Sequence, residues 1–147
     1  MKLPTIALAF AITIIPTALA QSYPLIPLAY STIYDEPSAL VTVLTCGEQL
    51  KTLGYTTLGS LPGYPYIGGS VNVTDGDASS PNCGECALIN FAGAFATVLL
   101  VDHADEGIVV SEEVMQWLAP NGNVSDYPYG TAELLEESDP SHCGLST

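Results

Sequence analysis

The sequence contains almost no basic residues. It has no arginine, and Lys2 and Lys51 are its only lysines, whereas 16 aspartates and glutamates give a formal net charge of −14 at pH 7. A surface of this sign repels nucleic acids and anionic lipids, because both carry closely spaced negative charges. We therefore expect neither a nucleic acid nor a membrane among the partners of this protein.

Long apolar segments are also scarce. The longest run, residues 6–15, is shorter than the roughly 20 residues that a membrane-spanning helix needs. It follows Lys2 and precedes Ala18-Leu19-Ala20, where small residues occupy the outer positions, and this arrangement is typical of a secretory signal peptide. We predict a signal peptide at residues 1–20, a single domain at residues 21–147, and a protein secreted to the extracellular space or cell wall.

The motifs of common enzyme classes are missing as well. The chain has no Gly-x-Ser-x-Gly elbow, no zinc motif and no phosphate-binding loop. A glycosidase generally needs two carboxylates that flank the scissile bond, and no motif pairs Asp105 or Glu106 with Asp102. We predict a non-catalytic protein with no metal site and no cofactor.

Four cysteines are present, and two of them stand close together in Cys83-Gly84-Glu85-Cys86. A redox pair of this spacing needs a helix that begins at the motif, but an apolar, strand-like run follows here. A zinc site needs a second ligand pair at short spacing, and the chain has none. Structural disulfides are therefore favoured, in a secreted chain above all.

Four cysteines allow three pairings. If Cys83 is linked back to Cys46 and Cys86 forward to Cys143, both halves of the chain are pinned to one point. Closing two consecutive loops of this length stabilises the fold by about 4 kcal/mol each in the chain-entropy model. A local bridge between Cys83 and Cys86 would close a small ring and restrain little.

The rest of the chain predicts a β-rich domain. Residues 21–28 read as a loose arm, residues 40–45 as a β-branched stretch leading into Cys46, and residues 54–69 as an irregular loop rich in Gly, Pro and Tyr. Short strands are expected at residues 28–34, 87–91, 94–102, 108–110 and 131–135, and the second and third of these should form a hairpin around Gly93. Many short strands indicate a small closed barrel.

Only residues 111–118 have a helical pattern. Ser111 is a suitable N-cap, and Val114, Trp117 and Leu118 should share one face, with Trp117 anchoring the helix on the barrel. Two sequons, at Asn72 and Asn123, lie among turn residues, where N-glycosylation is expected.

Several segments together resemble the cerato-platanin family of small secreted fungal proteins. They are residues 54–62, Ile67-Gly68-Gly69, Ser80-Pro81-Asn82-Cys83-Gly84-Glu85-Cys86, Val101-Asp102-His103-Ala104 and Cys143-Gly144-Leu145. The resemblance implies a mainly β fold, a double-psi β-barrel with one or two short helices and two disulfides, Cys46–Cys83 and Cys86–Cys143. It also implies a non-hydrolytic protein that binds chitin-type N-acetylglucosamine oligomers or loosens cellulose, and that plants can perceive as an elicitor through a host receptor.

The same resemblance suggests four carbohydrate-binding residues: Asp102, His103, Tyr30 and Tyr34. Asp102 would face a groove at the end of an apolar strand, and the alternative is an aspartate that holds loop amides. His103 could instead be a packing residue of the loop. Tyr30 and Tyr34 are spaced to project from one face of a strand, where an aromatic ring can stack on a sugar; the alternative is a structural role inside the domain.

The chain also departs from the family pattern. Ala78 and Ala87 stand where the family has tryptophans, Ser31 replaces an aspartate, residues 106–109 replace a Gly-x-Gly-Phe-Asn segment, and the loop after Cys46 is short. These changes favour a second hypothesis, an effector or interaction protein that keeps the scaffold but has degraded sugar binding. A weakly lytic enzyme is a third hypothesis, disfavoured because no second carboxylate is placed beside Asp102.

Overall fold

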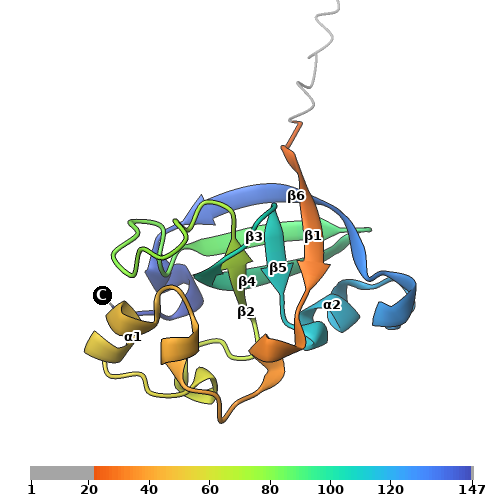
Figure 1. Ribbon diagram of the computed structural model, residues 1–147. Coiled ribbons are helices and arrows are strands. Elements are labelled where there is room, and N and C mark those ends of the chain that lie inside the picture. Colours follow the sequence, from red (N-terminus) through yellow and green to blue (C-terminus); the bar gives the residue numbers. More distant parts are fainter. Residues whose placement is uncertain (1–21, 147) are drawn as a thin grey trace, which may run out of the picture.

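A computed structural model describes residues 22–146, and its strands close into one barrel in the order β1-β5-β2-β4-β3-β6 (Figure 1). The strands are β1 (Leu25–Tyr30), β2 (Ile67–Ser70), β3 (Cys86–Phe91), β4 (Ala94–His103), β5 (Ile108–Val110) and β6 (Tyr129–Ser138). The pairs β1–β5 and β2–β4 are parallel, and the other four are antiparallel. The mainly β barrel implied by the resemblance is confirmed.

The predicted signal peptide, residues 1–20, lies outside the described residues. Within residues 22–146, no helix has both the length and the apolar character that crossing a membrane would require.

The predicted hairpin is confirmed, whereas the first strand is shifted toward the N-terminus and the last strand is longer than predicted. β3 and β4 pair through Phe91 and Ala94 around a two-residue turn in which Ala92 and Gly93 both have positive φ. β1 begins at Leu25, inside the expected loose arm, because it pairs with β6 along its length. β6 in turn begins at Tyr129 instead of residue 131.

The one or two short helices implied by the resemblance are confirmed as two, although the sequence pattern indicates only the helix at residues 111–118. Residues 41–43 form a 3-10 turn, and α1 (Gly47–Thr52) follows directly after Cys46. This turn fits because Gly47 has no side chain: a Cβ there would lie 2.3 Å from the Val41 carbonyl oxygen. The β-branched residues pointed to extended chain, but burial of Val41 and Leu50 in one core decides the local structure.

The barrel interior forms the first core, and α2 (Glu112–Leu118) covers one end of it. The buried side of this helix consists of Val114, Met115 and Leu118. The Ser111 N-cap is confirmed, since its Oγ accepts a hydrogen bond of 3.2 Å from the Val114 N–H. The predicted anchoring role of Trp117 is wrong: the side chain is 63% exposed, because Met115 occupies the buried face in its place.

A second core lies outside the barrel wall, where residues 31–66 fold against β2 and β4 (Figure 1). Its members include Tyr34, Leu58, Ile67, Leu99 and Val101. Strand β4 is therefore covered on both faces, with Val98 and Leu100 in the first core. This explains its unbroken apolar run, since a strand covered on both faces loses the usual alternation.

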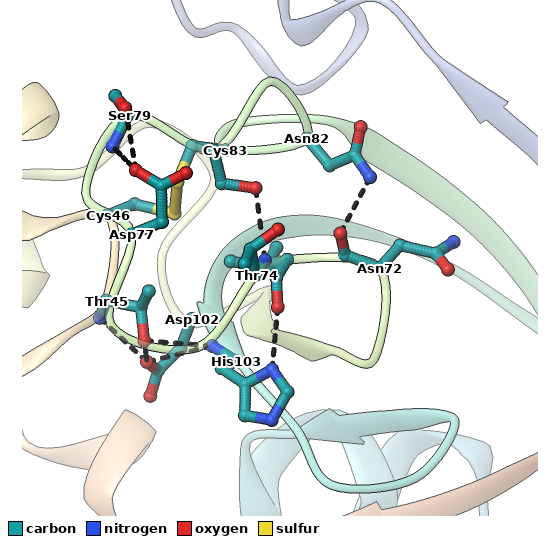
Figure 2. The surroundings of a disulfide bond; sticks show 12 residues. Thr45, Cys46, Asn72, Thr74, Asp77, Ser79, Asn82, Cys83, Asp102 and His103 are labelled. Atoms are coloured by element: carbon teal, nitrogen blue, oxygen red, sulfur yellow. Dashed lines mark hydrogen bonds between the residues drawn. A yellow bond between two sulfur atoms is a disulfide. The ribbon is translucent and has the colours of Figure 1, made fainter.

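Both predicted disulfides are confirmed. Cys46–Cys83 and Cys86–Cys143 each join residues whose Cα atoms are 5.6 Å apart, and they close consecutive loops. Figure 2 shows the first bridge, which holds the start of α1 against the turn before β3. The second ties the start of β3 to the 3-10 turn η5 (Pro140–Cys143) near the C-terminus.

Candidate functional site

Asp102 stands at the end of β4, next to a bulge that sets the direction of its side chain. Gly68 of β2 pairs with Leu100, but Gly69 pairs with Asp102, so Val101 has no partner of its own on β2. Simple alternation from Val98 and Leu100 would point Asp102 into the barrel. The extra residue turns the carboxylate outward instead, onto the same side as Val101.

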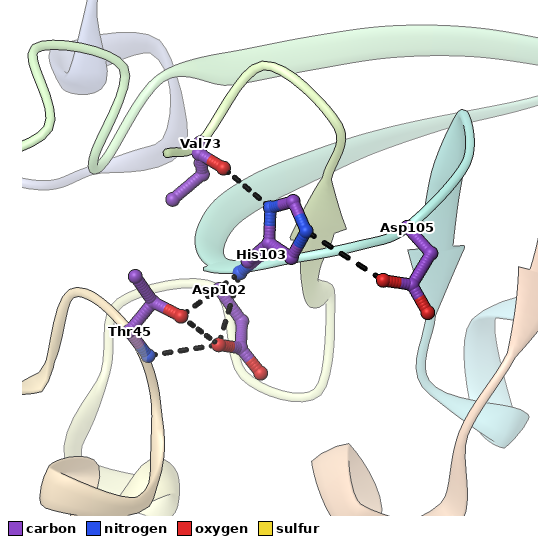
Figure 3. A network of polar contacts seen from close by, with 5 residues as sticks. All are labelled: Thr45, Val73, Asp102, His103 and Asp105. Atoms are coloured by element: carbon purple, nitrogen blue, oxygen red, sulfur yellow. Dashed lines mark hydrogen bonds and ion pairs between the residues drawn. The ribbon is translucent and has the colours of Figure 1, made fainter. Parts of the chain in front are cut away.

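The outward carboxylate of Asp102 is held by four donors (Figure 3 shows three of them). Its Oδ1 accepts hydrogen bonds from the Thr45 N–H at 2.8 Å, the Thr45 hydroxyl at 2.8 Å and the His103 N–H at 3.0 Å. Its Oδ2 accepts one bond, from the Tyr34 hydroxyl at 3.1 Å. This arrangement matches the alternative in which the aspartate holds loop amides, although Oδ2 keeps capacity for another donor.

The first disulfide supports the same network (Figure 2). Thr45 precedes Cys46, and the Cys46 N–H donates to the Val101 carbonyl at 3.1 Å, one residue before Asp102. The bridge from Cys46 to Cys83 therefore fixes the chain that supplies two of the donors to the carboxylate.

Tyr30 and Tyr34 do not share the face of a strand, so that prediction is wrong. β1 ends at Tyr30, and Ser31 then caps a 3-10 turn, η1 (Thr32–Asp35), because its side chain accepts from the Ile33 N–H. Tyr30 packs against the first core, whereas Tyr34 is buried in the second. Burial and the neighbouring Asp102 carboxylate raise the pKa of Tyr34, which keeps its hydroxyl a proton donor.

His103 positions a loop. Its Nδ1 lies 2.6 Å from the Val73 carbonyl oxygen, so this nitrogen carries a proton, and its Nε2 lies 3.8 Å from Asp105 (Figure 3). These contacts match the packing alternative. Among residues 22–146, no three His, Cys, Asp or Glu side chains are grouped closely enough to hold a metal ion.

A straight row of paired residues crosses the outer face of the barrel from Asp102. Its Cα partners are, in order, Asp102, Gly69, Val109, Ala29 and Tyr129. Directly paired residues point to the same face of a sheet, and five strands at about 4.8 Å spacing give the row a length of about 19 Å. Gly69 is buried beneath the Tyr34 hydroxyl, so only Val109 and Ala29 form an accessible apolar floor beside Tyr129.

A cleft of about 600 Å³ covers the half of this row nearer Tyr129. The Tyr129 side chain is 78% exposed, and the other lining residues are Pro27, Leu28, Ala29, Asp105, Glu106, Val109 and Gly130. Asp102 does not line this cleft; its loop neighbours Asp105 and Glu106 supply the carboxylates there. The arrangement offers an exposed aromatic ring, an apolar floor and two hydrogen-bond acceptors.

The sequence reasoning missed Tyr129 because it began the last strand at residue 131. A signal was present: Gly130, Ala132 and Leu134 alternate with Tyr129 and Thr131, which are exposed. Extending that alternation by two residues would have placed the tyrosine on the outer face.

Comparison with known proteins identifies the family. The family model Cerato-platanin matches residues 26–145. The chain belongs to the cerato-platanin family. It is 33% identical over 122 residues to the heat-stable 19 kDa antigen of Coccidioides immitis, a match that covers 80% of each chain.

Solved cerato-platanins have the same fold. The crystal structure of cerato-platanin 1 from M. perniciosa superposes with a TM-score of 0.69 at 30% identity, covering 80% of this chain and 98% of the other. The solution structure of the fungal elicitor Cerato-Platanin gives a TM-score of 0.62 at 24% identity, covering 80% and 95%. The family model and the solved structures thus agree on the family and on the barrel. This fold is consistent with a protein that has no enzymatic activity.

Most positions at which this cerato-platanin departs from the family pattern lie away from the outer row. Ala87 is buried in the first core, so the missing tryptophan there concerns packing. Ala78 lines a separate hollow beside α1. Ser31 caps a turn. Only Val109 lies on the row, where it contributes to the apolar floor.

Both predicted glycosylation sites are exposed. Asn72 follows β2, and its Nδ2 donates to Glu137 at 2.8 Å. Asn123 caps the 3-10 turn η4 (Val124–Asp126), and its Nδ2 lies 3.2 Å from Asp126. A glycan would replace one of the two hydrogens of such a nitrogen and leave the other as a donor, so glycosylation of either residue remains a prediction.

Proposed function

We propose that this protein is a secreted, non-catalytic component of the fungal cell wall that binds chitin-type N-acetylglucosamine oligomers in the cleft at the Tyr129 end of the outer row. The observation that carries the proposal is the cleft of about 600 Å³ in which the exposed Tyr129 stands beside Ala29 and Val109. Loosening of cellulose is the related activity that the same surface would support.

The chemistry of the cleft suits a neutral sugar. A tyrosine ring can stack on the C–H face of a pyranose, and its hydroxyl offers a hydrogen bond. Asp105 and Glu106 can accept hydrogen bonds from sugar hydroxyls and from an acetamido N–H. The scarcity of cations argues against acidic sugars, because Lys51 is the only basic side chain beyond the signal peptide apart from the two histidines.

The carboxylates favour binding over hydrolysis. A glycosidase needs one carboxyl group kept protonated by its surroundings and a second placed across the bond. The Asp105 side chain is fully exposed, so nothing buries it in the way a general acid requires. Asp102 is already engaged by Tyr34, Thr45 and His103.

The second candidate is an effector or elicitor that a host recognises through the surface of the same scaffold. The relative from Coccidioides immitis is named an antigen, and one structural neighbour is named a fungal elicitor. The internal bonding of Asp102 supports this candidate, because four donors from the domain itself already hold the carboxylate that the resemblance assigned to a sugar.

Binding of the mature protein to insoluble chitin and cellulose separates the two candidates. We expect the wild type to sediment with chitin and Tyr129→Ala to bind about tenfold more weakly, a loss of about 1.4 kcal/mol. Tyr23→Ala is the matched control, since Tyr23 is an exposed tyrosine that does not line the cleft. If the wild type binds neither polymer, the proposal fails and the effector candidate becomes the better one.

A further inference from the structure

A second aromatic surface lies on the other side of the barrel. It consists of Tyr66, Phe95, Thr97, Gln116 and Trp117, and we call it the Trp117 surface. Strand β4, which carries Phe95 and Thr97, stands three positions from β1 in either direction around the closed barrel. The Trp117 surface is therefore separate from the cleft at Tyr129.

The ring of Trp117 is exposed but fixed in orientation. Its Nε1–H donates a hydrogen bond of 3.1 Å to the Phe95 carbonyl. α2, which carries this ring, is held against rotation about its axis because Val114 and Leu118 are buried in the first core. A side chain already held in one rotamer loses little entropy on binding. The exposed fractions of 63% for Trp117 and 55% for Phe95 leave a large apolar area available to a ligand.

Two adjoining hollows extend this surface, and Tyr66 lines both. The first, about 270 Å³, is lined by Tyr66, Glu113, Gln116 and Trp117. The second, about 240 Å³, is lined by Gly63, Tyr66, Thr97, His142 and Cys143. Because Tyr66 also packs against the first core, the core holds its side chain in place. The result is a shallow groove with aromatic rings along it and polar groups at its edges.

We infer that this groove is a second polysaccharide-binding site, which takes a neutral β-linked chain of N-acetylglucosamine or glucose. Trp117 and Tyr66 would stack on the C–H faces of sugar rings. The Gln116 amide both donates and accepts, and the Glu113 carboxylate accepts, so together they match sugar hydroxyls. The choice of sugar rests on the proposed function, whereas the site itself rests on the geometry of the Trp117 surface.

Charge argues against the other ligands that stack on aromatic rings. Single-stranded nucleic acids need cations beside the rings. Here Glu113 and His142 are the only acidic or basic side chains that line the groove, and the only lysine of the described residues, Lys51, lies on α1. A stable protein interface buries roughly 800 Å² on each partner. A narrow groove with a carboxylate at its edge fits a single extended chain better.

Trp117 is the only tryptophan of the chain, so its fluorescence reports on this surface alone. We would titrate the mature protein with a soluble N-acetylglucosamine hexamer and with a β-linked glucose hexamer, and follow binding by calorimetry. The expected result is a blue shift of the emission and at least a twofold fall in acrylamide quenching, in the wild type and in Tyr129→Ala alike. Calorimetric binding without any change in Trp117 fluorescence would overturn the inference, as would binding of neither hexamer.

Substitutions separate this site from the cleft at Tyr129. Trp117→Ala should weaken binding to insoluble chitin or cellulose about tenfold, and the double variant with Tyr129→Ala should lose binding altogether. Leu40→Ala is the matched control, because Leu40 is 56% exposed and lines neither surface. Should Trp117→Ala fail to fold in circular dichroism, Gln116→Ala, an exposed residue of the same groove, takes its place.

The two proposals fail in different ways. Loss of binding in Trp117→Ala with no change in Tyr129→Ala would support the Trp117 surface as a binding site and refute the cleft at Tyr129. Loss in Tyr129→Ala with no change in Trp117→Ala and Gln116→Ala would do the reverse and overturn the second site.

Discussion

Gly69 of β2 pairs with Asp102 of β4 across a bulge, directly beneath the Tyr34 hydroxyl that donates to the same carboxylate. A Cβ at Gly69 would lie 2.8 Å from the His103 carbonyl oxygen and 2.9 Å from the Tyr34 hydroxyl oxygen. The position therefore accepts only glycine, and the approach of Tyr34 to Asp102 depends on it.

The first prediction concerns that glycine. Gly69→Ala should lower the free energy of unfolding by about 1–3 kcal/mol, because the added methyl group overpacks the site and displaces Tyr34 from Asp102. Urea denaturation measures the change. In a Tyr34→Phe background the penalty should be smaller, since one of the two close contacts is then absent. Equal penalties in both backgrounds would show that Tyr34 is not displaced.

The second prediction concerns Asp102. The Asp102→Asn variant removes a charged acceptor from two backbone amides, so we expect a loss of about 1.5–3 kcal/mol in unfolding free energy. Chitin binding should fall less than in Tyr129→Ala, because the carboxylate lies beyond the cleft. Thr45→Val is the matched control: it removes the hydroxyl bond to Asp102 and the 3.3 Å bond that the same oxygen accepts from the His103 N–H, keeps the Thr45 amide bond, and should cost about 1 kcal/mol. An Asp102→Asn variant of unchanged stability that no longer binds would assign the residue to the ligand instead.

The third prediction concerns pH. The acidic surface repels itself as carboxylates ionise, so the protein should be more stable in mildly acidic buffer than at high pH, at low salt above all. Burial and the nearby Glu137 carboxylate raise the pKa of Glu85. The stability that this group contributes is therefore present below the ordinary glutamate pKa and is lost as the pH rises through the raised pKa. Hydrogen bonds from Ser79 and Ser141 lower the pKa values of Asp77 and Asp139, and these exposed groups act weakly in the opposite direction.

Tyr34 should add a distinct step at alkaline pH. Its pKa is raised in the folded state, so its contribution is fully present below the ordinary tyrosine pKa of about 10 and is lost as the pH rises further. Denaturation of wild type and Tyr34→Phe from about pH 5 to about pH 11 tests both parts. Stability that climbs steadily toward neutral pH at low salt would contradict the charge argument, and parallel curves above pH 10 would contradict the role of Tyr34.

The elements with local signals were predictable. The turn at Gly93 between two apolar runs predicted the hairpin of β3 and β4, because a two-residue turn with positive φ needs such a residue. Ser111 predicted the start of α2, because its side chain satisfies an amide within the same turn. The cysteine spacing limited the chain to three pairings, and the resemblance to the family implied the pairing that is observed.

Features that depend on distant residues were not predictable from the sequence. α2 receives a second cap from Asp35, whose two carboxylate oxygens accept from the Glu112 and Glu113 amides at 2.7 and 3.1 Å. Residues 41–52 fold as a 3-10 turn and a helix because they pack into the second core. Asp35 is 77 residues from Glu112, and residues 41–52 pack on Leu99 and Val101 of the distant strand β4, so the local sequence does not reveal these partners.

The acidic charge, the cysteine framework and the local turns and caps could be read from the sequence, because each depends on residues close together in the chain or on a simple sum over it. The directions in which Asp102, Tyr34, Trp117 and Tyr129 face depend instead on contacts between distant segments. The direction of a strand residue depends on the register between strands, and a single extra residue at Val101 reverses it for Asp102. Trp117 faces solvent because its neighbour Met115, on the same helix, occupies the core in its place.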